Sequence, residues 1–91
     1  MYQVKPKNIN RFKHDFERLE KREREKVWQA LKTLTEIPVP PNAICLEKNY
    51  YRLKIDNIRI LYQILDEKII LIGAIVKRNE NTYKNWKKYF K

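Results

Sequence analysis

The sequence has almost none of the residues on which disulfides and most metal sites depend. Cys45 is the only cysteine and His14 is the only histidine in 91 residues. A disulfide framework, a cysteine-based zinc site, a three-histidine metal site and a two-histidine ribonuclease centre are therefore excluded. Carboxylates do not cluster in the strand region either, so two-metal phosphodiester chemistry has no ligands there. We expect no metal and no cofactor, and a surface role without chemistry for His14.

Glycine and long apolar segments are also scarce. Gly73 is the only glycine, which excludes a glycine-rich phosphate loop and a nucleophile elbow. The longest apolar run, IILIGAIV at 69–76, has eight residues, far fewer than the ~20 that cross a bilayer. The opening stretch MYQVKPKNINRFKHDF contains no apolar signal region. We therefore expect a cytoplasmic protein that makes no membrane contact.

Basic residues, in contrast, are abundant. Lys and Arg number 21 against 11 Asp and Glu, which gives a formal net charge of +10. An excess of this size predicts a polyanionic partner such as nucleic acid, although a soluble lysine-rich protein would show the same totals. A length of 91 residues and a hydrophobic fraction of 43% fit one globular domain over 1–91 rather than a disordered chain.

Apolar periodicity predicts two helices after a short first strand at 2–5. The charged run EKREREK at 20–26 is expected to separate the helices, and PVPP at 38–41 to end the second one. Asn8 or Asn10 can cap the first helix. The apolar positions are Ile9, Phe12, Phe16 and Leu19 in the first helix, and Val27, Ala30, Leu31, Leu34 and in addition Trp28 in the second. Asp15 is expected to face solvent.

Three further strands are predicted at 50–55, 58–65 and 68–76, joined by the turn signals Asp56-Asn57 and Asp66-Glu67. With two-residue turns, Lys54 lies opposite Arg59, and Arg59 lies opposite Ala74. Gly73 then allows a helix to approach the apolar face of the sheet. A short C-terminal helix at about 80–90 carries Trp86, Tyr89 and Phe90 as packing residues. The predicted fold is α+β, with a strand and a helical hairpin packed on an antiparallel meander.

The same alternation places four cations on one face of the sheet: Arg52, Lys54, Arg59 and Arg78. Like charges directly opposite one another destabilise a sheet, and a bound phosphate would relieve the repulsion. The alternative is that all four are ordinary solvated strand residues. Tyr83 could lie over this face and stack on a base, or it could anchor the C-terminal helix.

Such a cluster could cleave RNA through attack by the 2′-OH. Arginine stabilises the charge that develops on the phosphorus at any pH. A lysine can take the 2′-OH proton only when neighbouring cations lower its pKa from about 10.4. Lys54, surrounded by arginines, is the candidate for this role.

The segments YRLKI (51–55) and IRILYQILDEKIILIGAIVKR (58–78), followed by Tyr83, resemble the RelE/ParE superfamily of bacterial and archaeal type II toxins. The strand–helix–helix–three-strand order and the length match as well. The resemblance implies a fold like that of microbial ribonucleases and, for RelE-type members, metal-independent cleavage of mRNA in the ribosomal A site. It implies the catalytic set Arg52, Lys54, Arg59, Arg78 and Tyr83. Lys48, Lys77 and Lys84 are expected to bind RNA around that set.

In those roles, Lys54 with Arg52 lies near the attacking 2′-OH, Arg59 on the scissile phosphate and Arg78 at the leaving oxygen, while Tyr83 orients the base. The implied partners are the ribosome, mRNA and an acidic cognate antitoxin, with DNA contacted only through the antitoxin complex. Two alternatives stay open. One is a ParE-like toxin that inhibits DNA gyrase without nuclease activity, and the other is an RNA-binding module without catalysis.

Overall fold

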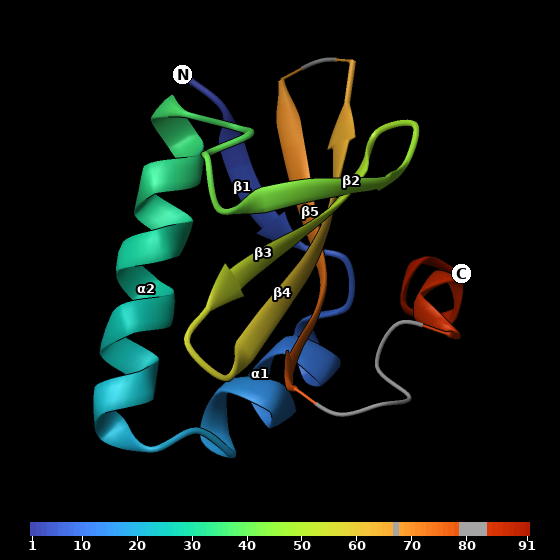
Figure 1. Ribbon diagram of the computed structural model, residues 1–91. Coiled ribbons are helices and arrows are strands. Elements are labelled where there is room, and N and C mark those ends of the chain that lie inside the picture. Colours follow the sequence, from blue (N-terminus) through green and yellow to red (C-terminus); the bar gives the residue numbers. More distant parts are fainter. Residues whose placement is uncertain (67, 79–83) are drawn as a thin grey trace.

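The computed structural model describes residues 1–66, 68–78 and 84–91, which form a sheet with helices packed against it (Figure 1). The elements in chain order are β1 (Gln3–Pro6), α1 (Ile9–Glu17), α2 (Lys21–Glu36), β2 (Ala43–Glu47), β3 (Tyr50–Ile55), β4 (Ile58–Leu65), β5 (Ile69–Lys77) and the 3-10 helix η1 (Trp86–Phe90). The strand order is β1-β5-β4-β3-β2, with β1 parallel to β5 and the other pairs antiparallel. The predicted α+β class is confirmed, and β2 is a strand that was not predicted.

The two helices begin and end for local reasons. Asn8 caps α1, since its side chain accepts a hydrogen bond of 3.0 Å from the main-chain N–H of Arg11. The expected break over 20–26 is wrong, because α2 already begins at Lys21. There the main-chain N–H of Glu20 donates to Glu23 Oε1 at 2.9 Å, so the charged run forms the first turn of α2. The helix ends at Glu36, before the prolines, as predicted.

The core lies between α2 and one face of the sheet. Val27 and Leu34 of α2 are fully buried, as are Ile60 and Tyr62 of β4. Three helical positions differ from expectation. Ile9 and Trp28 are about half exposed, at 52% and 51%, whereas Asp15 is buried at 2%. Within the described residues, no helix is both long and apolar enough to cross a membrane.

The register between β3 and β4 is the predicted one, with Lys54 opposite Arg59. The predicted register between β4 and β5 is wrong. Leu65 pairs with Ile69, so the connecting turn has three residues instead of two, and a bulge further along adds one more residue to β5. As a result, Ile70 and Ile72 point into the core, whereas the prediction placed them on the opposite face.

Gly73 lies at this bulge, and a ring packs closely against it. A Cβ at Gly73 would come within 2.5 Å of Phe90 Cζ, so a side chain there would displace the ring. The predicted close approach is therefore real, but it comes from η1 on the face opposite α2 (Figure 1). The predicted C-terminal helix is confirmed only as η1, because residues 79–83 lie outside the described part of the chain.

Candidate functional site

Four cations occupy the face of the sheet that points away from α2, and we call this group the basic face: Arg52, Lys54, Arg59 and Arg78. Lys54 of β3 lies directly opposite Arg59 of β4. Arg52 is two residues from Lys54 on the same strand, so both side chains point to the same side. Arg78 directly follows β5, and its main-chain N–H donates to Asn57 O at 2.6 Å.

The observed register places Arg78 nearer to Arg59 than the predicted register did. Arg59 lies opposite Val76 rather than Ala74. Arg78 follows Val76 by two residues, which is a separation of about 6.6 Å along the strand and preserves the face. In the predicted register, Arg78 followed Ala74, the expected partner of Arg59, by four residues. The structure therefore brings the four cations of the prediction together at one end of the β3–β4 hairpin.

Arg59 is the buried member of the basic face, with only 4% of its surface exposed. Its Nη1 donates to the main-chain oxygens of Asp56 at 2.8 Å and Ile58 at 3.0 Å. The Asp56 carboxylate is bonded instead to Lys26 Nζ of α2, and this hydrogen bond lowers the pKa of Asp56. The Asp56 carboxylate therefore binds a lysine of α2. Arg59 instead donates to main-chain oxygens in the turn and at the start of β4.

The other cations of the face differ in exposure. Lys54 and Arg78 are exposed, and Arg52 is partly buried. Asn42 makes two hydrogen bonds to the main chain of Lys54. Its side-chain Nδ2 donates to Lys54 O at 2.7 Å, and its main-chain oxygen accepts from Lys54 N–H at 3.1 Å. This support comes from the residue before β2, which was not predicted as a strand.

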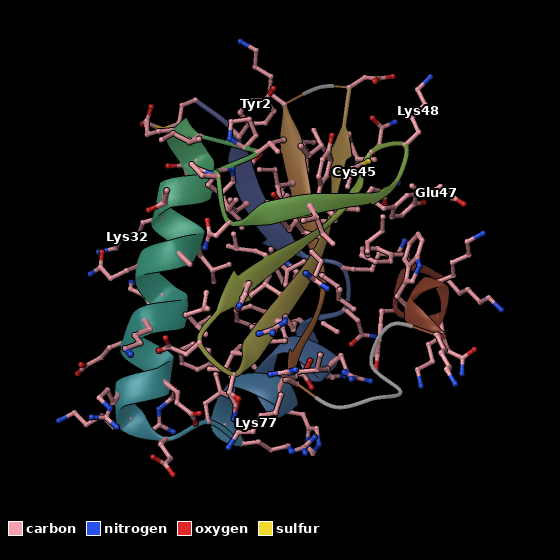
Figure 2. The ribbon with its side chains drawn as sticks, viewed as in Figure 1. Tyr2, Lys32, Cys45, Glu47, Lys48 and Lys77 are labelled. Carbon is pink, nitrogen blue, oxygen red and sulfur yellow. The ribbon has the colours of Figure 1, made fainter. Side chains whose placement is uncertain are left out.

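The lysines expected to surround the site do not all lie on its side of the sheet. Lys77 lies opposite Ile58, and its Nζ is 3.5 Å from Glu23 Oε1 of α2, so it belongs to the helix side. Figure 2 shows Lys48 and Lys77 at opposite ends of the molecule. Lys48 is in the turn between β2 and β3, and Lys84 is exposed just before η1. Tyr83 lies outside the described residues.

A buried carboxylate that the sequence did not reveal supports the end of β5. Asp15 of α1 accepts from the main-chain N–H of Ile75 at 3.0 Å and from Arg11 Nε at 3.0 Å. The guanidinium of Arg11 lies 4.6 Å from the centre of the Tyr89 ring in η1. Burial alone would lower the pKa of Arg11, but the hydrogen bonds and charge of Asp15 outweigh it and raise that pKa. The i,i+4 spacing of Arg11 and Asp15 was a visible sign of an ion pair, whereas nothing marked its burial.

Comparison with known proteins places this arrangement in a family. A model of the ParE toxin of the type II toxin-antitoxin system parDE matches residues 9–82. The structure is similar to the isolated E. coli RelE toxin, with a TM-score of 0.71, 22% identity and 97% of each chain covered. A chain of the intact E. coli RelBE toxin-antitoxin complex gives a TM-score of 0.71 and 21% identity, over 88% of this chain and 100% of that chain.

A third structure, the RelBE2 toxin-antitoxin complex from Mycobacterium tuberculosis, gives a TM-score of 0.70 and 20% identity, over 85% of this chain and 98% of that chain. A search of curated protein sequences found no match. At these identities the solved structures show a shared fold, and the family model covers most of the chain. The chain therefore belongs to the ParE toxin family of type II toxin-antitoxin systems, within the RelE/ParE superfamily.

Proposed function

We propose that this toxin is a metal-independent endoribonuclease that cuts mRNA in the ribosomal A site. The observation that carries the proposal is the direct opposition of Lys54 and Arg59, with Arg52 and Arg78 on the same face. Paired cations on neighbouring strands cost stability unless something offsets them. A scissile phosphate on the basic face would do so, and a toxin that acted only by binding a protein would have no chemical need for the full set.

The proposed reaction is an internal transesterification. The 2′-oxygen attacks the adjacent phosphorus, the bond from phosphorus to the 5′-oxygen breaks, and a 2′,3′-cyclic phosphate forms. The proton of the 2′-OH passes to a base, for which Lys54 is our candidate with Arg52 beside it, and the leaving 5′-oxygen gains a proton at Arg78. Tyr83 is proposed to orient the base next to the cut.

The different exposures of the cations suggest different roles. Lys54 and Arg78 are exposed and can meet the RNA first. Arg59 is almost buried and already donates to turn carbonyls, so its role is to hold positive charge beneath the phosphate. Guanidinium charge in a partly dry site stabilises a developing oxyanion more than it would in water.

The proposed partners are the ribosome with its mRNA, and an antitoxin that binds the free toxin. Two of the similar structures are toxin-antitoxin complexes, which supports the second partner. A net charge of +10 favours an acidic antitoxin. DNA contact is proposed only through the antitoxin complex, and Lys48 and Lys84 remain candidates for auxiliary RNA contacts.

A gyrase-inhibiting toxin is the second candidate, and the match to the ParE family model favours it. One fold serves both activities in the superfamily, so the fold cannot decide between them. The decisive experiment is inducible expression followed by primer extension on translated mRNA and by a DNA supercoiling assay on the same cells. Codon-phased cuts would support the nuclease, and gyrase poisoning without such cuts would support the alternative.

Arg78→Ala tests the site itself. The side chain is exposed, so the variant should fold normally while cleavage falls by about 10²–10⁴-fold. Lys32→Ala is the matched control, because Lys32 is an exposed residue of α2 (Figure 2), and α2 packs on the face of the sheet opposite the basic face. Growth arrest that persists undiminished in Arg78→Ala would contradict the nuclease.

Binding of single-stranded RNA should weaken as the salt concentration rises. About four phosphate contacts predict a slope of about −3 for the logarithm of the binding constant against the logarithm of the salt concentration.

A further inference from the structure

An aromatic pocket lies on the same side of the sheet as the basic face. Its volume is about 260 Å³, and its lining residues are Glu47, Tyr50, Trp86, Lys87, Phe90 and Lys91. The ring centres of Trp86 and Phe90 are both 5.0 Å from that of Tyr50. The pocket is thus formed where η1 packs on Tyr50, the first residue of β3, and Lys87 and Lys91 are among the residues that line it.

The pocket and the basic face are continuous along one strand. Tyr50, Arg52 and Lys54 alternate along β3, so all three side chains point to the same side of the sheet. Tyr50 is about 6.6 Å from Arg52 and about 13 Å from Lys54 along the strand. A ligand that rests on Lys54 and Arg52 therefore meets Tyr50 next. Aromatic rings that follow a line of cations are the combination by which proteins hold single-stranded nucleic acid.

Lys87 already occupies a position over the indole ring. Its Nζ lies 5.9 Å from the centre of the Trp86 ring and 3.1 Å from Glu47 Oε1. The side chains of Lys87 and Glu47 are 65% and 51% exposed, and an ion pair at such exposure contributes little to stability. A planar base could take the place of the ammonium group over the ring, and Lys87 could then turn to a phosphate.

We propose that this pocket binds a nucleobase of the same single-stranded RNA whose phosphate lies on the basic face. The base stacks on Trp86 and Tyr50, while Lys87 and Lys91 contact the adjoining backbone. The inference rests on the proposed nuclease function, and it adds a subsite that fixes the path of the RNA along β3. In this arrangement η1 forms part of the surface that binds the RNA, and its Phe90 packs against Gly73.

Fluorescence of Trp86 tests the subsite directly. Trp28 and Trp86 are the two tryptophans of the chain, so Trp28→Phe leaves Trp86 as the reporter. The probe is a 2′-O-methyl tetranucleotide, which cannot undergo attack by a 2′-oxygen. We expect saturable quenching of Trp86, and we expect Trp86→Leu to weaken binding of the labelled probe by about tenfold or more. Trp86→Phe should retain most of the binding, because a ring remains, and Lys32→Gln should bind like the wild type.

The outcomes separate this inference from the proposed function. Quenching that survives in Arg78→Ala while cleavage is lost would support both. Cleavage by the wild type without quenching of Trp86, or equal probe binding by a folded Trp86→Leu variant, would overturn the subsite and leave the nuclease intact. Quenching without any cleavage by the wild type would overturn the nuclease and retain the pocket as an RNA-binding site. Loss of binding in both Trp86→Phe and Trp86→Leu would show that the ring is not a stacking surface, and would overturn the inference.

Discussion

Asp15 should be one of the most sensitive positions in the protein, although it carries no proposed chemistry. Strand β1 pairs with β5 only over Ile69–Ile72, so the N–H of Ile75 lies beyond the end of its neighbour. The Asp15 carboxylate accepts that N–H at 3.0 Å in a buried environment. A hydrogen bond to a charged group contributes about 1.5–3 kcal/mol, and an N–H left buried without a partner costs about 1–3 kcal/mol.

These two losses overlap, so we expect Asp15→Ala to lower the free energy of unfolding by about 2–4 kcal/mol. For a domain of this size the corresponding fall in Tm is on the order of 10–30 °C. Urea unfolding followed by circular dichroism gives the free energy, and amide hydrogen exchange should show the Ile75 N–H protected in the wild type and exposed in the variant. The Arg11 side chain is 38% exposed, so its ion pair with Asp15 is screened and supplies the smaller part.

A variant pair isolates the hydrogen bond to Ile75 from the ion pair. In an Arg11→Met background, Asp15→Asn keeps an uncharged oxygen that can accept the N–H, whereas Asp15→Ala removes it. We expect the asparagine variant to be more stable than the alanine variant by about 1–3 kcal/mol. Equal stability of the two variants, or an Ile75 amide that stays protected in both, would refute the account of this carboxylate.

For two other groups, the Tyr62 hydroxyl and the Glu23 carboxylate, the direction of the pKa shift predicts how stability changes with pH. Tyr62→Phe should cost about 0.5–1.5 kcal/mol in urea unfolding, since the Tyr62 hydroxyl donates to Pro38 O at 2.7 Å. Burial raises the pKa of Tyr62, so its contribution is complete below its ordinary pKa of about 10 and declines above it; absorbance titration should show one tyrosine that resists ionisation. The N–H of Glu20 lowers the pKa of Glu23, so stability from Glu23 is complete above about pH 5 and lost as the pH falls through the depressed value. Between about pH 5 and 3, Glu23→Gln should lose less stability than the wild type. Tm values that fall equally in the two proteins over this range would contradict the prediction.

The β3–β4 hairpin could be predicted because its sequence leaves one consistent pairing. Asp56-Asn57 is a strong two-residue turn signal, and a shift by one residue would turn Ile60 and Tyr62 out of the core. Strand β2 offered no comparable signal. Its five residues begin just after Asn42, which follows the last proline, and they form a strand through their pairing with β3, for example Ala43 with Leu53. Such an edge strand depends on tertiary contacts that the local sequence does not display.

The start of α2 was misjudged for a different physical reason. A run of charges without apolar residues resembles a linker, yet acidic groups in a first helical turn satisfy free N–H groups and favour the helix dipole. The burial of Asp15 was equally hidden. Its position on the helix is polar by pattern, and only the early end of β1 leaves an N–H of β5 that needs an acceptor. Both errors come from judging a side chain by its polarity without asking which main-chain group it could satisfy.

The basic face was predicted correctly in composition even though the register that led to it was wrong. The three-residue turn after Leu65 shifts β5 by one residue, which exchanges its faces and sends Ile70 and Ile72 into the core. The bulge at Gly73 adds a second residue, and a shift of two restores the faces beyond that point. Val76 therefore lies opposite Arg59, and Arg78 keeps the face that the prediction gave it. The glycine has two connected effects: it gives space to Phe90, and the bulge at that position returns Arg78 to the side of the sheet where Lys54 and Arg59 lie.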